Sequence, residues 1–516
     1  MTVGSALPSR GGHARALEGR TTPANRGEQE AAQKRRRTRR SSGSANGRRR
    51  RREDYDVRFP TSLEQHGSDA MHTEPDYSVA YVVIETDGGH EGYGLTFTLG
   101  KGTEVVVCAV EALSAFVVGR TLQEIVGDFR AFYRLLTCDG QMRWIGPEKG
   151  VIQLATAAVL NAVWDLWARV EGKPLWKLLV DMVSESAECR HVQMSAFFSY
   201  ATRAAVQTFT GVSSCQEPRK LVSCIDFRYI TDALTEEEAL DILVKAREGK
   251  CQREEEMLRD GYPAYTTSCA WIGYSDQQLK EVSVTLLHPF KVKVGADLQD
   301  DVRRCRLVRQ MIGPDNTLMI DANQRWDVQE AITWVSHLAE FKPLWIEEPT
   351  SPDDILGHAV ISKALAPLGI GVATGEQCHN RVMFKQLLQA SALQFVQIDS
   401  CRLGSVNENL AVILMACKFH VPVCPHAGGV GLCELVRHLI LFDYISVSAS
   451  LQNRMCEYVD HLHEHFKSPV VIRNACYVPP KDPGYSTEMR EESVRRYQYP
   501  QGEVWQTLQA TRGHRT

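Results

Sequence analysis

The spacing of apolar positions predicts an α+β domain in the first part of the chain. Residues 80–86 form a β-branched run that predicts a strand ahead of the turn Asp87-Gly88-Gly89, and residues 93–98 are its expected hairpin partner. Beyond Gly102 apolar residues recur every three or four positions, most regularly in residues 155–179, which predicts helices. We therefore assign residues 53–182 to one α+β domain.

The pattern changes twice before it becomes regular again. Residues 183–220 are rich in aromatic residues, serine and threonine and keep neither helical nor strand spacing, so we expect an irregular insertion there. Residues 221–260 form a connecting segment, with a polar helix from Thr235 to about Asp260. From Tyr262 onwards, short β-type runs alternate with helical runs, and this alternation predicts parallel strands.

Each short β-type run in the second half of the chain ends in a polar or charged residue. Successive ends lie 28, 26, 29, 23, 27 and 31 residues apart, which is the length of one β/α unit. These ends are Lys293, Asp321, Glu347, Glu376, Asp399, His426 and Glu457. In a β/α barrel, the carboxyl ends of all strands meet on one face. We therefore predict a barrel at residues 261–460, followed by a C-terminal segment, residues 461–516, that returns to the first domain.

Composition is typical of a folded protein with a large core. The 516 residues suffice for a barrel of about 250 residues and a companion domain, and 43% of them are hydrophobic. The 15 cysteines are scattered without a CxxC pair, which argues against a disulfide framework and a zinc finger. The longest apolar runs, such as residues 411–417, fall short of the roughly 18 residues that span a bilayer. We therefore expect no integral membrane segment.

The first 52 residues differ from the rest of the chain. Arginines cluster in residues 34–40 and 48–52, between serine, glycine and alanine, and almost no large apolar side chain is present. Such a segment is expected to be disordered. Its arginine-rich, acid-poor composition fits a mitochondrial transit peptide, whereas the arginine runs also fit a nuclear signal or a nucleic-acid patch. A solvated tail without such a role is the alternative. With a net charge of -4, nucleic-acid binding is expected only through this tail.

Three of the strand ends are carboxylates on successive β/α units. Asp321, Glu347 and Glu376 offer the hard oxygen ligands that Mg²⁺ prefers. A single carboxylate at the end of a strand is more often a helix cap or an ion-pair partner. Three in consecutive units favour a metal site.

Basic groups accompany these carboxylates. Lys291 and Lys293 lie on the same side of their strand, and two buried ammonium groups near a dication lower each other's pKa, which makes one a usable base. Asp399 can hold the imidazole of His426 and keep it basic. Taken singly, the Lys-Val-Lys pattern is also common on surface strands, and a lone histidine is more often structural.

Together these motifs resemble the mandelate-racemase-like branch of the enolase superfamily. The resemblance rests on Lys291-Val-Lys293, Asp321-Ala-Asn323, Trp345-Ile-Glu-Glu-Pro349, Gly375-Glu376, Asp399 and His426. Further motifs are similar to those of L-fuconate dehydratases: Asp69-Ala-Met-His-Thr-Glu-Pro-Asp-Tyr77, Arg143-Trp-Ile-Gly-Pro-Glu-Lys-Gly150, Asp321-Ala-Asn-Gln-Arg-Trp326 and Pro425-His-Ala-Gly-Gly429. The resemblance covers about residues 56–499. It implies an α/β fold, a modified TIM barrel of the (β/α)7β type with an N-terminal α+β capping domain.

The resemblance also implies roles for individual residues. Members of this superfamily use a lysine or histidine base with Mg²⁺ that stabilises an enediolate. The implied metal ligands are Asp321, Glu347 and Glu376, and the implied catalytic residues are Lys293 as base and His426, supported by Asp399, as acid. The implied substrate-binding residues are Gly67, Ser68, Asp69, Tyr77, Lys291, Asn323, Glu376, His426, Ala427, Gly428 and Glu457.

The implied reaction is the dehydration of an acid sugar. L-Fuconate, converted to 2-keto-3-deoxy-L-fuconate and water, is the first candidate, and we expect a homo-oligomer located in mitochondria. A racemase or epimerase of the same superfamily is an alternative. A catalytically inert isoform with a binding or regulatory role is another alternative, because the sequence departs from the family at two places.

Both departures are local. Residues 183–220 have no counterpart in the family, and residues 281–289 are shorter than the expected first barrel helix. We expect that helix to be short or frayed at its C-terminal end, with Pro289 starting the second barrel strand abruptly. A shift of this strand would carry Lys293 away from the substrate.

Overall fold

The computed structural model describes residues 53–146, 148–183, 217–267, 270–285 and 289–513. The arginine-rich segment 1–52 and residues 184–216 of the expected insertion lie outside the described residues. The insertion was predicted to end at Lys220, but helix α8, Glu217–Ser223, begins inside it.

An antiparallel three-stranded sheet opens the described chain. It consists of β1 (Glu53–Arg58), β2 (Ser78–Glu85) and β3 (Glu91–Thr98). Glu85 pairs with Glu91, which confirms the predicted hairpin. Helix α5 (Gly150–Val170) packs closely on β3, because a Cβ at Gly92 or Gly94 would collide with backbone carbonyl oxygens of this helix.

The helical spacing predicted at residues 155–179 belongs to two helices. Helix α5 ends at Val170, and α6 (Leu175–Asp181) follows it. Gly172 between them has a positive φ of 65° and Pro174 precedes α6, so neither residue continues a helix. The spacing of apolar residues continues across this break because both helices bury apolar faces.

The expectation that no apolar run is long enough to span a membrane is wrong for α5. This helix has 21 residues and passes that test by length and composition. In the folded chain, 89% of the apolar window of α5 is buried. A core helix explains its composition, because burial on all sides requires apolar residues all round.

Short helices complete this part of the structure. They are α2 (Thr103–Leu113), α3 (Leu122–Gly127), α4 (Phe129–Thr137), α9 (Glu236–Lys245) and α10 (Lys250–Asp260), with 3-10 turns at Thr61–Glu64, Ser114–Phe116 and Met142–Ile145. The polar helix predicted from Thr235 is interrupted between α9 and α10, where Gly249 has a φ of 69°. Its start is confirmed, since Thr235 and Glu238 form a capping box.

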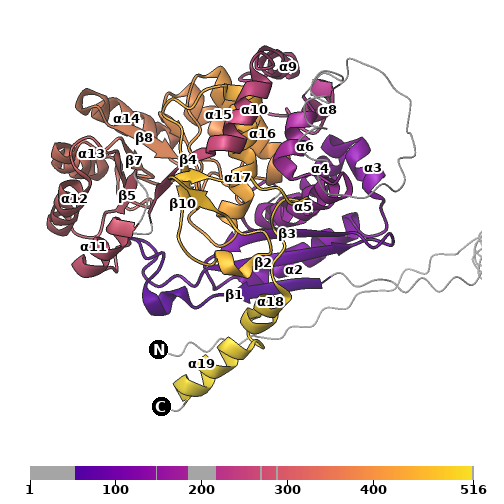
Figure 1. The fold of residues 1–516 in the computed structure, drawn as a ribbon, viewed down its shortest axis with the longest axis horizontal. Coiled ribbons are helices and arrows are strands. Elements are labelled where there is room, and N and C mark those ends of the chain that lie inside the picture. Colours follow the sequence, from indigo (N-terminus) through magenta and orange to yellow (C-terminus); the bar gives the residue numbers. More distant parts are fainter. Residues whose placement is uncertain (1–52, 147, 184–216, 268–269, 286–288, 514–516) are drawn as a thin grey trace, which may run out of the picture. The chain divides into compact units, whose positions relative to one another are not determined.

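The remainder forms the predicted (β/α)7β barrel (Figure 1). Its strands are β4 (Tyr262–Thr266), β5 (Phe290–Lys293), β6 (Leu318–Asp321), β7 (Trp345–Glu347), β8 (Gly371–Thr374), β9 (Phe395–Val396) and β10 (Cys456–Tyr458). The connecting helices are α11 (Asp276–Thr285), α12 (Leu298–Ile312), α13 (Val328–Leu338), α14 (Ile355–Leu365), α15 (Arg381–Gln389), α16 (Ser405–Lys418) and α17 (Leu432–Asp443). Figure 1 shows α12 to α14 outside β5, β7 and β8.

The segment predicted as the seventh strand, residues 421–426, closes the barrel without being a regular strand. Val423 makes one isolated bridge with Val396, and the amide of Glu457 on β10 donates to the carbonyl of Pro425 at 3.3 Å. Pro422 and Pro425 have no amide hydrogen, so a continuous ladder cannot form through this segment.

The second barrel strand lies in register with its neighbours. Each residue of β5 pairs with one of β6, from Phe290 with Leu318 to Lys293 with Asp321. Helix α11 has 10 residues, one more than α15 in the same barrel, and residues 286–288 after it lie outside the described part of the chain. The short connection therefore leaves Lys293 at the carboxyl end of the barrel.

The C-terminal segment contacts the first sheet. It contains a 3-10 turn (His463–His465), β11 (Ile472–Arg473), β12 (Cys476–Tyr477), α18 (Glu491–Tyr497) and α19 (Glu503–Gly513), whereas a π-helix (Tyr444–Ser448) directly follows α17 within the barrel. Trp505 donates from its indole nitrogen to the carbonyl of Arg58 at 2.9 Å, and the amide of Tyr499 donates to Asp56 at 2.8 Å. These bonds attach the end of the chain to β1.

Candidate active site

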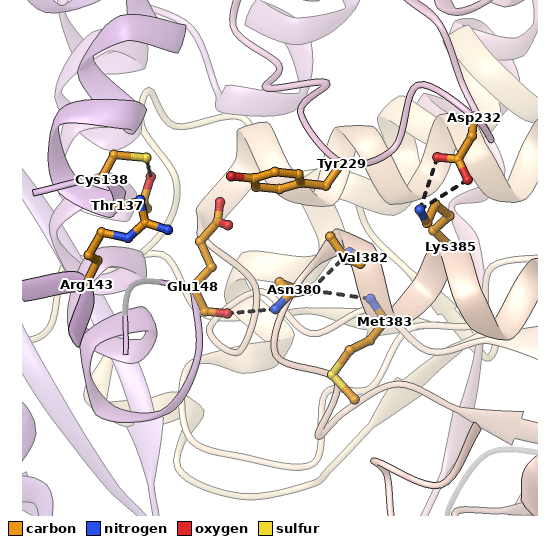
Figure 2. Close-up of a pocket in the computed structure, with 10 residues that line it drawn as sticks. All are labelled: Thr137, Cys138, Arg143, Glu148, Tyr229, Asp232, Asn380, Val382, Met383 and Lys385. Carbon is orange, nitrogen blue, oxygen red and sulfur yellow. Dashed lines mark hydrogen bonds and ion pairs between the residues drawn. The ribbon is translucent and has the colours of Figure 1, made fainter. Parts of the chain in front are cut away.

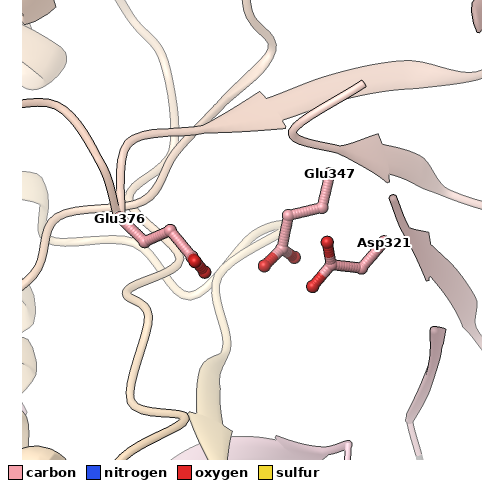
Figure 3. A group of neighbouring side chains, drawn as sticks. All are labelled: Asp321, Glu347 and Glu376. Carbon is pink, nitrogen blue, oxygen red and sulfur yellow. The ribbon is translucent and has the colours of Figure 1, made fainter. Parts of the chain in front are cut away.

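Three carboxylates converge at the carboxyl face of the barrel (Figure 3). Asp321 and Glu347 end β6 and β7 and are paired in the sheet, whereas Glu376 lies two residues beyond β8. One oxygen of each lies within 4.8 Å of the others. Asp321 and Glu347 are fully buried, and Glu376 is slightly exposed. Such a set can hold a hard divalent cation.

Both lysines of β5 reach this carboxylate cluster. Lys291 Nζ contacts Glu347 and lies 3.3 Å from Asp321 Oδ2 and 2.9 Å from Glu457 Oε1. Lys293 Nζ donates to Asp321 Oδ2 at 2.6 Å and to Asn323 Oδ1 at 2.9 Å. The residues predicted at the ends of β5, β6, β7 and β10 are therefore brought together by the barrel.

The lysine pKa expected beside a dication stays a prediction, and the carboxylates alone act in the opposite direction. Burial disfavours the charged forms, but Glu347 and Glu457 around Lys291, and Asp321 beside Lys293, raise the pKa of both lysines. For Lys293, the carboxylate of Asp321, whose Oδ2 lies 2.6 Å from Nζ, outweighs the repulsion from the ammonium group of Lys291. Burial and the nearby Asp321 raise the pKa of Glu347 to about 8.

His426 lies on the other side of the carboxylates from Lys293. Its Nδ1 is 2.7 Å from Asp399 Oδ2, and its Nε2 is 3.4 Å from Glu376 Oε2. Burial lowers the pKa of this imidazole, but Glu376 and Asp399 prevail and raise it to about 9. Asp399 is held in turn by the amides of Cys401 and Arg402, at 2.7 and 2.6 Å. The predicted pairing of Asp399 with His426 is therefore observed.

Glu457 connects the two sides of the site. Its Oε1 faces Lys291, and its Oε2 accepts from the amide of Ala427 at 2.9 Å. The hydroxyl of Thr267, which the sequence did not single out, donates to Glu457 at 3.1 Å. The amide of Gly428 donates to His426 Nε2 at 3.2 Å, and a Cβ at this glycine would lie 2.9 Å from the same nitrogen, so the close approach requires a glycine.

The loop between the first 3-10 turn and β2, residues 65–77, which we call the capping loop, contacts the barrel. Ser68 accepts from the amides of Ile272 and Gly273, which follow β4, at 3.1 and 3.0 Å. Gly67 has a φ of 76° and leaves no room for a Cβ beside the ring of Tyr77. The predicted loop residues therefore lie close to one another.

Two further residues near the site, besides Thr267, lie outside the sequence predictions. Arg402 Nε donates to the carbonyl of Glu376 at 3.1 Å, and His72 Nδ1 lies 3.1 Å from Asp69 Oδ2. Each follows a predicted site residue by three positions, Asp399 and Asp69. The sequence signal for both residues is an aspartate three positions earlier. The side chain of such an aspartate can accept from the amides two and three residues later, and this turn fixes the residue at the third position.

A separate cavity of about 660 Å³ lies beside α15 (Figure 2). Its walls include Arg143, Glu148, Tyr229 and Lys385, and the described residues that line it include none of the three carboxylates. The Arg143–Gly150 motif therefore contributes to this cavity. Asn380 Nδ2 donates to the carbonyl of Glu148 at 2.8 Å, which attaches the motif to the residue before α15.

Comparisons with known proteins agree with this geometry. The mandelate racemase/muconate lactonizing enzyme N-terminal domain matches residues 59–180, and the enolase C-terminal domain-like family matches residues 276–493. The crystal structure of human mitochondrial enolase superfamily member 1 has 69% sequence identity and a TM-score of 0.82, over 90% of this chain and 98% of that chain. L-Galactonate dehydratase of Hypocrea jecorina is 48% identical over 88% of this chain and 94% of its own length.

A solved racemase from Streptomyces coelicolor, with bound magnesium, shares the fold. Its sequence identity is 23% and its TM-score 0.62, over 87% of this chain and 99% of that chain. These matches extend through both the N-terminal sheet and the barrel. The chain therefore belongs to the enolase superfamily, in the branch of mandelate racemase and muconate lactonizing enzyme.

Proposed function

We propose that this protein is a Mg²⁺-dependent hydro-lyase that dehydrates an acid sugar, with L-fuconate as the first candidate. The observation that carries the proposal is the carboxylate cluster flanked by an ammonium group, Lys293, and an imidazole, His426. A dehydration that begins at the carbon next to a carboxylate needs these groups: a base, an acid and positive charge near the substrate. The 48% identity to an L-galactonate dehydratase supports this class of substrate.

The residues present fit Mg²⁺. Four carboxylates, those of the cluster and Glu457, face the ammonium groups of Lys291 and Lys293, so negative charge remains in excess. Burial raises the pKa of Glu347 most, and the charges of Asp321, Glu457 and Glu376 add to it. Asp321, Glu347 and Glu376 would hold the ion, and when bound it supplies positive charge for the substrate carboxylate as C2 loses its proton.

Lys293 is the proposed base. Its ammonium group is held by Asp321 and Asn323, so the nitrogen has a fixed position at the end of β5. In the proposed reaction, the charge of Asp321 that raises the pKa of Lys293 would be offset by the Mg²⁺ that Asp321 holds, and neutral Nζ takes the C2 proton. Lys291 is more deeply buried and faces Glu457, and we assign it to binding the substrate carboxylate.

His426 is the proposed acid. Asp399 orients the ring through Nδ1, which directs Nε2 toward Glu376 and the cluster. With a pKa of about 9, the imidazole is protonated at neutral pH and can deliver a proton to the departing 3-hydroxyl. The C–O bond at C3 breaks, water leaves, and the enol becomes a 2-keto-3-deoxy acid.

A panel of aldonic acids with and without EDTA tests the proposal. We expect L-fuconate to yield an α-keto acid, detected with semicarbazide, and EDTA to stop its formation. A folded protein that converts no acid sugar in the presence of Mg²⁺ would overturn the proposed function and leave the inert isoform as the better account.

Racemization or epimerization at C2 is the second candidate. It is favoured by the placement of Lys293 and His426 on opposite sides of the cluster, since either group could return a proton to C2. The same panel separates the two reactions. An epimerase inverts C2, which NMR detects, without forming any semicarbazide-reactive product.

We also propose that residues 1–52 direct the protein to mitochondria. The proposal rests on the arginine-rich, acid-poor composition of the segment. Import and cleavage of the full chain by isolated mitochondria would support it. Salt-sensitive RNA binding by the full chain, lost on deletion of residues 1–52, would instead favour a nucleic-acid role for the segment. Homo-oligomerization remains a prediction that light scattering can test.

A further inference from the structure

The capping loop presents a histidine next to the reacting groups, and this histidine has no role in the proposed chemistry. His72 is about one-third exposed, with 37% of its side chain accessible, whereas only 8% of the Asp69 side chain is accessible. Of the two side chains, the imidazole is therefore the one that a ligand can reach.

Asp69 is occupied within its own loop. Its Oδ1 accepts from the amides of Met71 and His72, both at 2.7 Å, and its Oδ2 lies 3.1 Å from His72 Nδ1. A carboxylate offers about four acceptor positions, so little capacity remains for a substrate hydroxyl. These bonds fix both the backbone and the ring of His72.

The loop lies over the ends of the first two barrel strands. Ser68 binds the segment after β4, as described above, and a Cβ at Gly295 would lie 3.4 Å from the Cβ of Ala70. Gly295 follows Lys293 by two residues. Glu376 and Lys293 also act electrostatically on His72, and Asp69 acts on Lys293. The ring therefore lies within electrostatic range of the reacting centre.

The orientation of the substrate follows from the barrel groups. In the proposed function, the carboxylate, C2 and C3 are engaged by Lys291, Lys293 and His426. Carbons C4 to C6 must then extend away from the barrel strands, on the side that the capping loop covers. A hydroxyl there needs a hydrogen-bond partner as it leaves water.

We propose that His72 is a specificity-determining residue whose Nε2 hydrogen-bonds a hydroxyl beyond C3 of the acid sugar, and that Asp69 is a positioning residue that holds this imidazole. The inference rests on the proposed function. Among the described residues, Nε2 of His72 has no hydrogen-bond partner, and only Nδ1 is engaged, by Asp69. The carboxylate of Asp69 offsets the charge of the ring, so the pair suits a neutral hydroxyl better than a second carboxylate.

Binding of two ligands tests the proposal. L-Fuconate carries hydroxyls beyond C3, whereas glycerate has only the carboxylate and the hydroxyls at C2 and C3. Calorimetry with Mg²⁺ would use proteins that also carry Lys293→Ala, so that no turnover occurs. We expect His72→Phe to weaken L-fuconate binding roughly tenfold, the loss of one hydrogen bond, and to leave glycerate binding unchanged.

Two further variants separate recognition from structure. His72→Gln keeps a polar side chain at this position and should recover most of the affinity for L-fuconate. The matched control is His90→Phe, because His90 is an exposed histidine in the β2–β3 turn. This variant should bind both ligands with unchanged affinity. Asp69→Asn should weaken the binding of L-fuconate, because the imidazole of His72 is then held less firmly, and should leave glycerate binding unchanged.

The outcomes are distinguishable from failure of the proposed function. The inference is wrong if wild type and His72→Phe bind L-fuconate with equal affinity. It is also wrong if His72→Phe weakens glycerate binding as much as L-fuconate binding. Both conclusions hold whether or not the protein forms a keto acid. A His72-dependent affinity for L-fuconate in a protein that forms no keto acid supports the inference and removes the dehydratase proposal. If neither ligand binds, both are wrong.

Discussion

At the residue scale, the active site is dominated by the distance between opposite charges. Lys293 lies 2.6 Å from Asp321, and His426 lies 2.7 Å from Asp399. Each basic group is thus oriented by a carboxylate. Removing one partner of a buried ion pair leaves an uncompensated charge, so a change at either residue should lower stability as well as proton transfer, and the fold of each variant has to be checked.

Replacing the proposed base isolates the first proton transfer. Lys293→Ala should abolish exchange of the C2 proton with deuterium, while Mg²⁺ still binds because its three ligands lie on other strands. NMR follows the exchange and calorimetry follows the metal. Deuterium that still enters C2 at the wild-type rate would contradict the role of Lys293.

Replacing the proposed acid isolates the second step. His426→Asn should stop the loss of the 3-hydroxyl, by at least about a hundredfold in rate, and leave C2 exchange by Lys293 running. Parallel assays of exchange and keto-acid formation check this. If both processes disappear while circular dichroism stays unchanged, the division of labour between Lys293 and His426 has to be revised.

The proposed metal ligands predict a direct change in affinity. Glu347→Gln removes a carboxylate but keeps the size of the side chain, and should weaken Mg²⁺ binding by at least about tenfold. Calorimetry measures this affinity in the absence of substrate. Glu340→Gln, on an exposed turn, is the control. Unchanged affinity would remove Glu347 from the ligand set.

At the scale of elements, the contact between β3 and α5 depends on two glycines. A Cβ at Gly94 would collide with the carbonyl oxygen of Ala158 and the amide of Ala162, both backbone atoms that cannot rotate away. Backbone contact of this kind cannot be read from apolar periodicity, because it depends on which strand the helix crosses. The hairpin and α5 themselves were predictable from their local patterns.

This contact predicts the effect of one added methyl group. Gly94→Ala should lower the free energy of unfolding by about 1–3 kcal/mol, as overpacking does, and lower Tm accordingly. Gly88→Ala in the hairpin turn is the control, since its Cβ would meet atoms only at 3.7 Å or beyond. Equal melting temperatures for the two variants would show that the helix can move away from the sheet at little cost.

At the scale of the whole molecule, a buried ion cluster joins the N-terminal helices to the barrel. Asp226 is buried and accepts from Arg134 of α4 at 2.8 Å and from Arg228 at 2.6 Å, and it lies 3.4 Å from Arg381 of α15. Burial raises the pKa of this carboxyl, but the bonds from the arginines outweigh it and lower the pKa to about 2.

The low pKa of Asp226 predicts how stability depends on pH. Its unfolded value is near 3.8, so its contribution is complete above pH 3.8 and disappears as the pH falls through about 2. The difference in free energy of unfolding between wild type and Asp226→Asn should therefore be largest above pH 4 and shrink toward pH 2. Urea unfolding across this range measures it. A difference that stays constant from pH 4 to pH 2 would show that protonation of Asp226 does not contribute to the loss of stability in acid.

The sequence by itself determined the class of fold and the residues that face the active site. Periodic runs that end in Lys293, Asp321, Glu347 and Glu376 suffice for this, because strand alternation is local and parallel strands place their ends on one face. Local pattern also predicted the hairpin. Apolar spacing does not place the break between α5 and α6, because this spacing continues across it.

Only the tertiary structure decided the charge states and the partners of those residues. The raised pKa of the lysines, the irregular seventh strand and the occupation of Asp69 by His72 all depend on distances and on backbone bonds. An electrostatic interaction varies with the separation of charges on different strands, and spacing along the chain does not report that separation. The sequence named the residues that meet at the carboxyl face of the barrel, and the fold set the distances that shift their pKa values.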